Sequence, residues 1–198
     1  MAEVKPIETV YNGYRFRSRL EARWAVFFDS LHVKYEYEPQ GFLLPSGRHY
    51  LPDFKVKCYG TRGEKGLVEP FDLYVEVKGF MSNEDADKII EFATRTDNPY
   101  LIDNPVLVVR TIPPPGCSTD SYFTESYDCM DGTKICPFNY QLIDGDYFAA
   151  YPAADKNGHF YLWGDDSNYI NFEDIQLVED AYTRARQARF EHGEMPRI

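Results

Sequence analysis

Cysteines are few in this sequence, and no two of them are close together. The four cysteines, Cys58, Cys117, Cys129 and Cys136, form no Cys-x2-Cys pair. Structural zinc sites prefer such close pairs, and cytosolic chains rarely keep disulfides. We therefore interpret all four side chains as ordinary reduced thiols.

Long apolar runs are also absent. No stretch of the chain is long enough to cross a membrane, and residues 1–19 lack the apolar core of a secretory signal. We therefore expect a cytoplasmic protein that has no membrane partner.

Positive charge is in the minority. The chain has 21 lysines and arginines against 32 aspartates and glutamates, which gives a net charge of −11. This balance argues against a protein that coats nucleic acid through bulk electrostatics. It leaves room for an enzyme that touches a few phosphates, because such binding depends on local charge and a metal ion can offset carboxylates.

The residues that are present predict a folded α/β protein. With 198 residues, 43% of them hydrophobic, we expect one domain that carries an elaboration. The apolar patterns predict, in order, a helix over 17–31, strands over 33–39, 49–59 and 71–80, a helix over 82–96 and a strand over 104–112. This order is typical of helices packed on a mixed central sheet.

The composition changes in the second half of the chain, where residues 117–172 are rich in tyrosine, phenylalanine, aspartate and glycine. We expect three parts: a core over 1–112, an aromatic-rich β insertion over 113–172 that packs on the core as a small antiparallel sheet, and a closing helix over 173–198 that stops at Gly193. The aromatic residues of the insertion either pack this sheet or stack on unpaired bases.

Two short strings in the predicted central strands carry chemistry, "PDF" (52–54) and "EVK" (76–78). Side chains alternate along a strand, so Glu76 and Lys78 share one face. If the two strands pair as a hairpin, Asp53 comes beside Glu76. Two carboxylates are what Mg²⁺ commonly takes from a protein, and a neighbouring lysine can position or deprotonate a water.

A lone E-x-K string has an ordinary explanation, since charges often alternate on an exposed strand face. The order Glu, Pro-Asp, Glu-x-Lys on helix, strand and strand is more informative, and with it the chain resembles the PD-(D/E)XK nuclease superfamily. The matching residues are Glu21 in "SRLEARWA", Pro52 and Asp53 in "LPDF", and 76–78 in "VEVKG", and the element order over 14–112 matches as well. Small phage- and mobile-element-associated members look most similar.

The resemblance implies a restriction-endonuclease-like core and a Mg²⁺-dependent endonuclease that hydrolyses DNA phosphodiester bonds, with Mn²⁺ as a substitute ion. It implies that Asp53, Glu76 and the Val77 carbonyl bind the metal. Lys78 would orient and activate the attacking water, and Glu21 would be a direct or water-mediated ligand. The implied location is the cytoplasm of a bacterium or of a phage-infected host.

Glu21 keeps two interpretations. Ser18 and Glu21 fit a capping box, in which the glutamate bonds back to the Ser18 N–H. At about 100° per residue, Glu21 also lies only about 20° around the helix from Phe28, at the edge of the apolar face where a metal ligand would have to be. Both roles could coexist.

Four basic residues are candidates for binding phosphate: Arg17, Arg19 and Arg23 flank Glu21, and Lys88 lies on the second predicted helix. Each has the alternative of being a solvated surface charge. DNA is the expected partner. The alternative function is a nucleic-acid-binding or assembly protein on a nuclease fold, with weak or lost catalysis, that acts within a phage or mobile-element complex. The expected assembly is a homodimer or a larger complex with basic partner proteins, and in that complex the basic partners would supply DNA affinity.

Overall fold

The most apolar predicted strand belongs to a mixed sheet, at the end of its strand order. In the computed structural model, β7 (Phe71–Val77) pairs in parallel with β8 (Val106–Val109), and every residue of β8 is buried. A strand buried on both faces is typical of a sheet that helices cover on two sides. The predicted α/β class with a mixed sheet is therefore confirmed.

The structure describes residues 6–62, 70–94, 103–112, 127–128, 134–135, 139–141, 147–164 and 172–190. Within these ranges, no helix is long and apolar enough to cross a membrane. Cys58 is buried. The other three cysteines, Gly193 and the aromatic side chains between residues 117 and 146 lie outside the description, so the predictions for them stay predictions.

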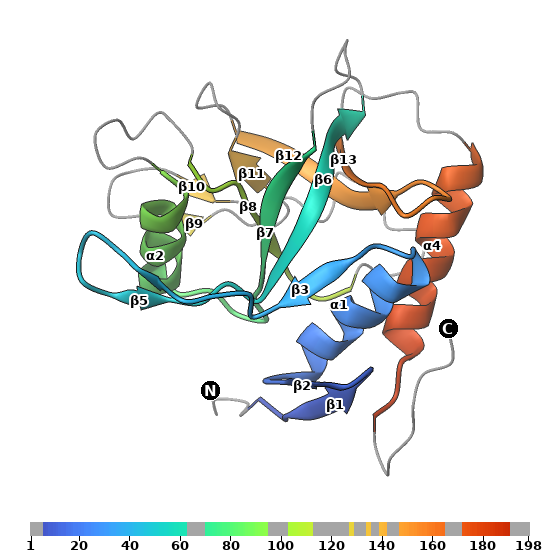
Figure 1. Ribbon diagram of the computed structural model, residues 1–198, viewed down its shortest axis with the longest axis horizontal. Helices are drawn as coiled ribbons and strands as arrows, with labels where there is room; N and C mark the ends of the chain where they lie inside the picture. Colours follow the sequence, from blue (N-terminus) through green and yellow to red (C-terminus); the bar gives the residue numbers. More distant parts are fainter. Residues whose placement is uncertain are drawn as a thin grey trace.

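The central sheet runs in the order β11-β12-β13-β6-β7-β8, and β3 also pairs with β6. The bounds of its other strands are β3 Tyr35–Tyr37, β6 Phe54–Arg62, β11 Asn139–Gln141, β12 Tyr147–Ala154 and β13 Phe160–Gly164. β3 pairs antiparallel with the start of β6, and β13 pairs in parallel with its later part. Two strands that are far apart in the sequence thus share one edge of β6 (Figure 1).

Helices cover both faces of this sheet (Figure 1). α1 (Arg19–Ser30) and α4 (Phe172–Gln187) pack on one face, and α2 (Asn83–Ala93) packs on the other. β7 contributes to both layers, because Val75 belongs to the core cluster with α1 and α4, whereas Tyr74 packs against the cluster with α2. The alternation of side chains along the strand gives each face its own core.

Serine caps define where the first two helices begin. The Ser18 side chain accepts the Glu21 N–H at the start of α1, as predicted. Ser82 caps α2 in the same way, and Asp85 returns a bond to the Ser82 N–H to complete a capping box. Both caps orient the first turn of a helix toward the ends of β6 and β7.

Three two-stranded hairpins accompany the central sheet in the described part of the chain: β1 (Thr9–Tyr11) with β2 (Tyr14–Phe16), β4 (Phe42–Leu43) with β5 (His49–Tyr50), and β9 (Tyr127–Asp128) with β10 (Lys134–Ile135). The first was not predicted, although Asn12-Gly13 is a strong hairpin signal. Both residues have positive φ, 46° and 82°, as a type I′ turn requires.

The strand predicted over 49–59 is interrupted. Residues 49 and 50 form β5, and β6 begins only at Phe54. Pro52 lies in the break, because proline has no amide hydrogen for a sheet ladder. Asp53 therefore lies just before the strand instead of within it.

Residues 139–141 and 147–164 are arranged differently from the small antiparallel sheet, packed on the core, that we expected. Their strands β11, β12 and β13 continue the central sheet, because β13 pairs with the part of β6 that extends beyond β3. The boundaries at residues 112 and 172 stay predictions.

The closing helix is shorter than predicted. We expected the helix to continue to a stop at Gly193, but α4 ends at Gln187. Phe190 leaves the helical path and packs edge-to-face against Tyr11, with ring centroids 5.9 Å apart. This contact ties the end of the described chain to the N-terminal hairpin.

Candidate active site

Asp53 lies at the entrance to β6, beside the end of β7. The antiparallel register pairs Phe54 with Val75, and one further step sets Asp53 opposite Glu76. Asp53 is 4% exposed. Its Oδ2 accepts the main-chain N–H of Val77 at 2.7 Å. The predicted hairpin pairing is therefore confirmed, and it brings Asp53 into the main chain of the E-x-K segment.

Glu76 is the second buried carboxylate, 3% exposed. Its Oε2 accepts the Tyr50 hydroxyl at 2.8 Å, and its Oε1 pairs with Lys78 Nζ at 2.8 Å. Lys78 Nζ also lies 3.6 Å from a carboxylate oxygen of Asp85 in the first turn of α2. Glu76 and Lys78 thus share the face of β7 that α2 covers, as the alternation predicted.

Glu21 reaches the same end of the sheet from α1, and its side chain is fully hydrogen-bonded. The Ser18 hydroxyl donates to Oε1 at 2.6 Å, and the Tyr37 hydroxyl donates to Oε2 at 2.8 Å. The Arg17 N–H donates to Oε2 at 3.1 Å. The return bond of the predicted capping box is therefore shifted by one residue, because the carboxylate takes the N–H of Arg17 and not that of Ser18.

Arg17 connects these groups. Its Nη2 lies 2.6 Å from Asp53 Oδ1, and its Nε lies 2.7 Å from Glu38 Oε1. Its main-chain N–H is shared between Glu21 and the Tyr37 hydroxyl, at 3.1 Å from each. A single residue before α1 therefore contacts two of the predicted metal ligands.

The other three candidate phosphate-binding residues lie elsewhere. Arg19 and Arg23 lie half-buried in the first turns of α1. Lys88 pairs with Glu84 one turn earlier on α2, at 2.8 Å. Their predicted roles stay predictions.

Electrostatic repulsion is the main feature of the site. Burial, followed by the negative charges of Glu76 and Glu21, raises the pKa of Asp53 well above its ordinary value. The Val77 N–H and the Arg17 guanidinium oppose this shift without cancelling it. Burial and two neighbouring carboxylates thus destabilise the charge of Asp53, and added positive charge would relieve this effect.

The two donors to Glu76 remain protonated at neutral pH. Burial lowers the pKa of Lys78, but the charge and hydrogen bond of Glu76, followed by the charge of Asp85, raise it further, so that it is above its ordinary value. Burial and the Glu76 carboxylate raise the pKa of Tyr50 well above its ordinary value. Both side chains therefore present hydrogens to Glu76.

The oxygen atoms at this point fit a small divalent cation. Asp53 and Glu76 supply carboxylates, which Mg²⁺ prefers. The Val77 N–H faces Asp53, and the carbonyl of a strand residue points to the same side as its N–H. The β6–β7 register sets Pro52 opposite Val77, and proline has no N–H to donate to this carbonyl. Mg²⁺ binds through such a small set and keeps several waters.

The acidic side chains of this candidate cation site are Asp53 and Glu76, from the paired strands. Glu21 approaches them from α1. Among the described residues, no group of three or more His, Cys, Asp and Glu side chains is arranged as a ready cation site. Both oxygens of Asp53 and both of Glu76 already have partners, two of which, Arg17 and Lys78, are positively charged and would compete with a bound ion.

Sequence reasoning missed four residues of the site: Tyr37, Glu38, Tyr50 and Asp85. Tyr50 lies three residues before Asp53, on the far side of the break at Pro52, and its spacing carries no signal of its own. Asp85 was visible only as a residue at a helix start. Its approach to Lys78 follows from the short connection between β7 and α2.

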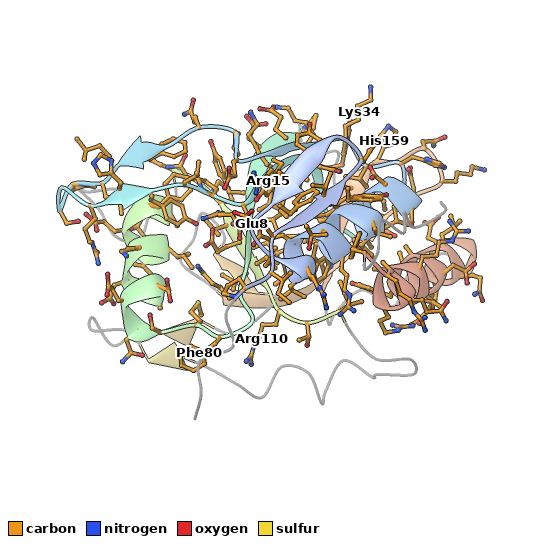
Figure 2. The ribbon with its side chains drawn as sticks, turned by 90° about the horizontal axis from the view of Figure 1, so that it is seen from below. Glu8, Arg15, Lys34, Phe80, Arg110 and His159 are labelled. Atoms are coloured by element: carbon orange, nitrogen blue, oxygen red, sulfur yellow. The ribbon has the colours of Figure 1, made fainter. Side chains whose placement is uncertain are left out.

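Two side chains near the end of β7 lie next to the site. Phe80, two residues after Lys78, is 78% exposed. Arg110, next to the end of β8, donates from its guanidinium to the Gly79 carbonyl at 3.4 Å, and Figure 2 shows Phe80 and Arg110 near each other. An aromatic ring and a guanidinium thus flank the end of β7, and such groups can stack on bases and contact phosphates.

Comparison of the chain with known protein families, with characterised proteins and with solved structures finds no match. Function must therefore be inferred from these residues and their geometry alone.

The raised pKa of Asp53 makes a prediction about stability. Between the ordinary value of 3.8 and the higher value in the folded protein, the folded state keeps a proton that the unfolded chain has released. The free energy of unfolding therefore falls as the pH rises through this window. Asp53→Asn removes the buried charge and should raise the free energy of unfolding at pH 7 on the order of 1–3 kcal/mol. This gain should shrink toward pH 4.

Urea unfolding with a chelator present, from pH 7 down to pH 4, measures this difference. Asp72→Asn is the matched control on β7, because Asp72 is exposed and pairs with Lys57, at 2.8 Å. It should change the free energy of unfolding by less than about 1 kcal/mol. An Asp53→Asn protein that is no more stable than wild type at pH 7 would show that Asp53 is well compensated.

Proposed function

We propose that the protein is a metal-dependent deoxyribonuclease, acting as an endonuclease, that hydrolyses phosphodiester bonds with water as the nucleophile. The observation that carries this proposal is the Asp53–Val77 hydrogen bond, which sets one buried carboxylate beside Glu76 and Lys78. The same residues carry the resemblance to the PD-(D/E)XK nucleases. We extend the proposal to the fold, and regard α1 to β8 as a restriction-endonuclease-like core.

Asp53, Glu76 and the Val77 carbonyl would hold Mg²⁺, or Mn²⁺ in its place, with Glu21 as a further ligand or a partner of a bound water. When bound, the ion supplies Lewis acidity toward a phosphate oxygen and lowers the pKa of a water molecule. The raised pKa of Asp53 supports this assignment, since a cation would stabilise its charge.

The surrounding residues have distinct roles in this proposal. Lys78 is held between Glu76 and Asp85 and presents its ammonium group to the attacking water. Tyr50 fixes one oxygen of Glu76, and Tyr37 fixes one oxygen of Glu21. Reactions of this kind depend on positioning, and these bonds position the carboxylates before substrate arrives.

The acidic balance of the chain limits how DNA could be held. Contacts would be few and local, and Arg17, Arg110 and the exposed ring of Phe80 are the groups near the site that suit phosphates and bases. The net charge of −11 is also the observation that favours the alternative, a nucleic-acid-binding or assembly protein in which basic partners or a second copy supply affinity.

Supercoiled plasmid separates the two proposals. A nuclease should convert it to nicked or linear forms with Mg²⁺ or Mn²⁺ and leave it intact with a chelator. Linear, single-stranded and four-way-junction DNA in the same assay would identify the preferred substrate. Binding of these DNAs without cleavage under every metal condition would instead support the binding or assembly protein.

Lys78→Ala should keep the fold and most of the metal affinity, and should lower the cleavage rate by at least about a hundredfold, the usual scale of acid–base assistance. Lys57→Ala is the matched control, because Lys57 also lies on the central sheet in a 2.8 Å ion pair, but far more exposed. Rates of plasmid nicking measure the difference. Equal rates for the two variants would make Lys78 a structural charge.

Glu21→Gln tests whether this carboxylate is more than part of a helix start. The amide oxygen can still accept from the Arg17 N–H and the Tyr37 hydroxyl, so the melting temperature should change little. Loss of the negative charge should strongly reduce cleavage if Glu21 assists the metal. Ser18→Ala is the complement: it should cost about 1 kcal/mol of stability and keep most of the activity. A Glu21→Gln protein with wild-type cleavage would leave Glu21 a purely structural residue.

A further inference from the structure

The guanidinium group of Arg17 occupies an oxygen atom that the proposed cation needs. Arg17 Nη2 lies 2.6 Å from Asp53 Oδ1, and the other oxygen of Asp53 accepts the Val77 N–H. Asp53 thus has one oxygen bonded to a side chain and one bonded to the main chain. A cation that binds this carboxylate comes close to both partners, and only the guanidinium carries a positive charge.

Of the two partners, Arg17 is the one that can leave. The Val77 N–H belongs to β7, whose main chain is held between β6 and β8. Arg17 lies between β2 and α1, and its side chain is 53% exposed. A divalent ion also repels a guanidinium at the same carboxylate, because both carry positive charge. Binding of the ion and the Arg17–Asp53 ion pair therefore oppose each other.

Arg17 stays close to the site after it leaves Asp53. Its main-chain N–H is bonded to Glu21 and Tyr37, and its Nε pairs with Glu38 Oε1 at 2.7 Å. Glu38 is itself fixed to the Asp53 segment, because its N–H donates to the Asp53 carbonyl at 2.9 Å. The side chain is thus held at its base and near Glu38, and its rigid, planar guanidinium leaves Asp53 by turning as a whole.

From these contacts we propose that Arg17 is a switch between metal and DNA. It neutralises Asp53 until a divalent cation takes its place, and the released Nη groups then bind a phosphate of the DNA substrate. A guanidinium fork matches phosphate geometry, so the exchange replaces one charge-assisted contact with another. The proposal rests on the proposed nuclease function and adds a role for Arg17 that the positions of the carboxylates alone do not require.

The switch has a thermodynamic consequence. Because the cation releases the group that binds phosphate, metal and DNA must strengthen each other's binding by the same factor. In the absence of DNA, a protein without Arg17 should bind metal more tightly than wild type does. In that protein, metal should no longer strengthen DNA binding, and DNA should no longer strengthen metal binding.

Calorimetric titration with Mn²⁺, without DNA, tests the first part. Arg17→Met should bind the ion about fivefold or more tightly than wild type, within the usual range of such couplings. Arg15→Met is the matched control, because it removes one positive charge two residues earlier, from an ion pair with Glu8 in which both side chains are exposed. Its metal affinity should stay within about twofold of wild type.

DNA binding tests the second part, with Lys78→Ala as the background so that cleavage is slow. Mn²⁺ should tighten binding of a short duplex when Arg17 is present and should fail to do so when Arg17→Met is added. Equal strengthening in both proteins would overturn the switch.

The unmodified protein offers a test that does not depend on how Arg17→Met folds. Nuclear magnetic resonance should resolve guanidinium signals of Arg17 that are held by the Asp53 pair, and these should change as Mg²⁺ is added, whereas those of Arg15 should not. If wild type binds metal but these signals and the Arg17→Met affinity are unchanged, the switch is wrong and the nuclease proposal stands. If wild type binds no metal at all, both proposals fail.

Discussion

The candidate site depends on the register between β6 and β7. Pairing of Phe54 with Val75 sets Asp53 beside Glu76 and lets Asp53 accept the Val77 N–H. A slip of one residue would turn Glu76 toward α1 and remove it from the face that α2 covers. The apolar residues that alternate along β7 fix this register, since each belongs to one of two separate cores. Packing far from the carboxylates therefore holds the carboxylates together.

Placing these carboxylates together in a buried site is electrostatically unfavourable, and several groups offset part of this cost. Arg17 and Lys78 bring positive charge to Asp53 and Glu76, and Tyr50 adds a hydrogen-bond donor. The compensation is incomplete, because the pKa of Asp53 is still raised. Functional sites commonly contain clusters of buried ionisable groups that lower the stability of the fold. This balance is the physical reason to regard the cluster as a site and not as an ordinary ion-pair network.

Sequence patterns predicted the parts of the fold that have strong local signals. Ser18 and Ser82 fixed the helix starts, and the apolar run of β8 indicated a strand buried on both faces. The pairing that brings Asp53 to Glu76 was also predictable, because consecutive strands usually pair. Contacts between distant segments were not, as with β13 against β6 or the Tyr50 hydroxyl on Glu76. They depend on how whole layers pack, which no short string of residues specifies.

The most direct test is a crystal structure of the protein grown with Mn²⁺, in which anomalous scattering locates the ion. We predict a peak bonded to carboxylate oxygens of Asp53 and Glu76 and to the Val77 carbonyl, with Arg17 turned away from Asp53. A structure in which Mn²⁺ binds only at exposed carboxylates, while the Arg17–Asp53 pair stays intact at saturating ion, would contradict a metal-dependent active site at this position.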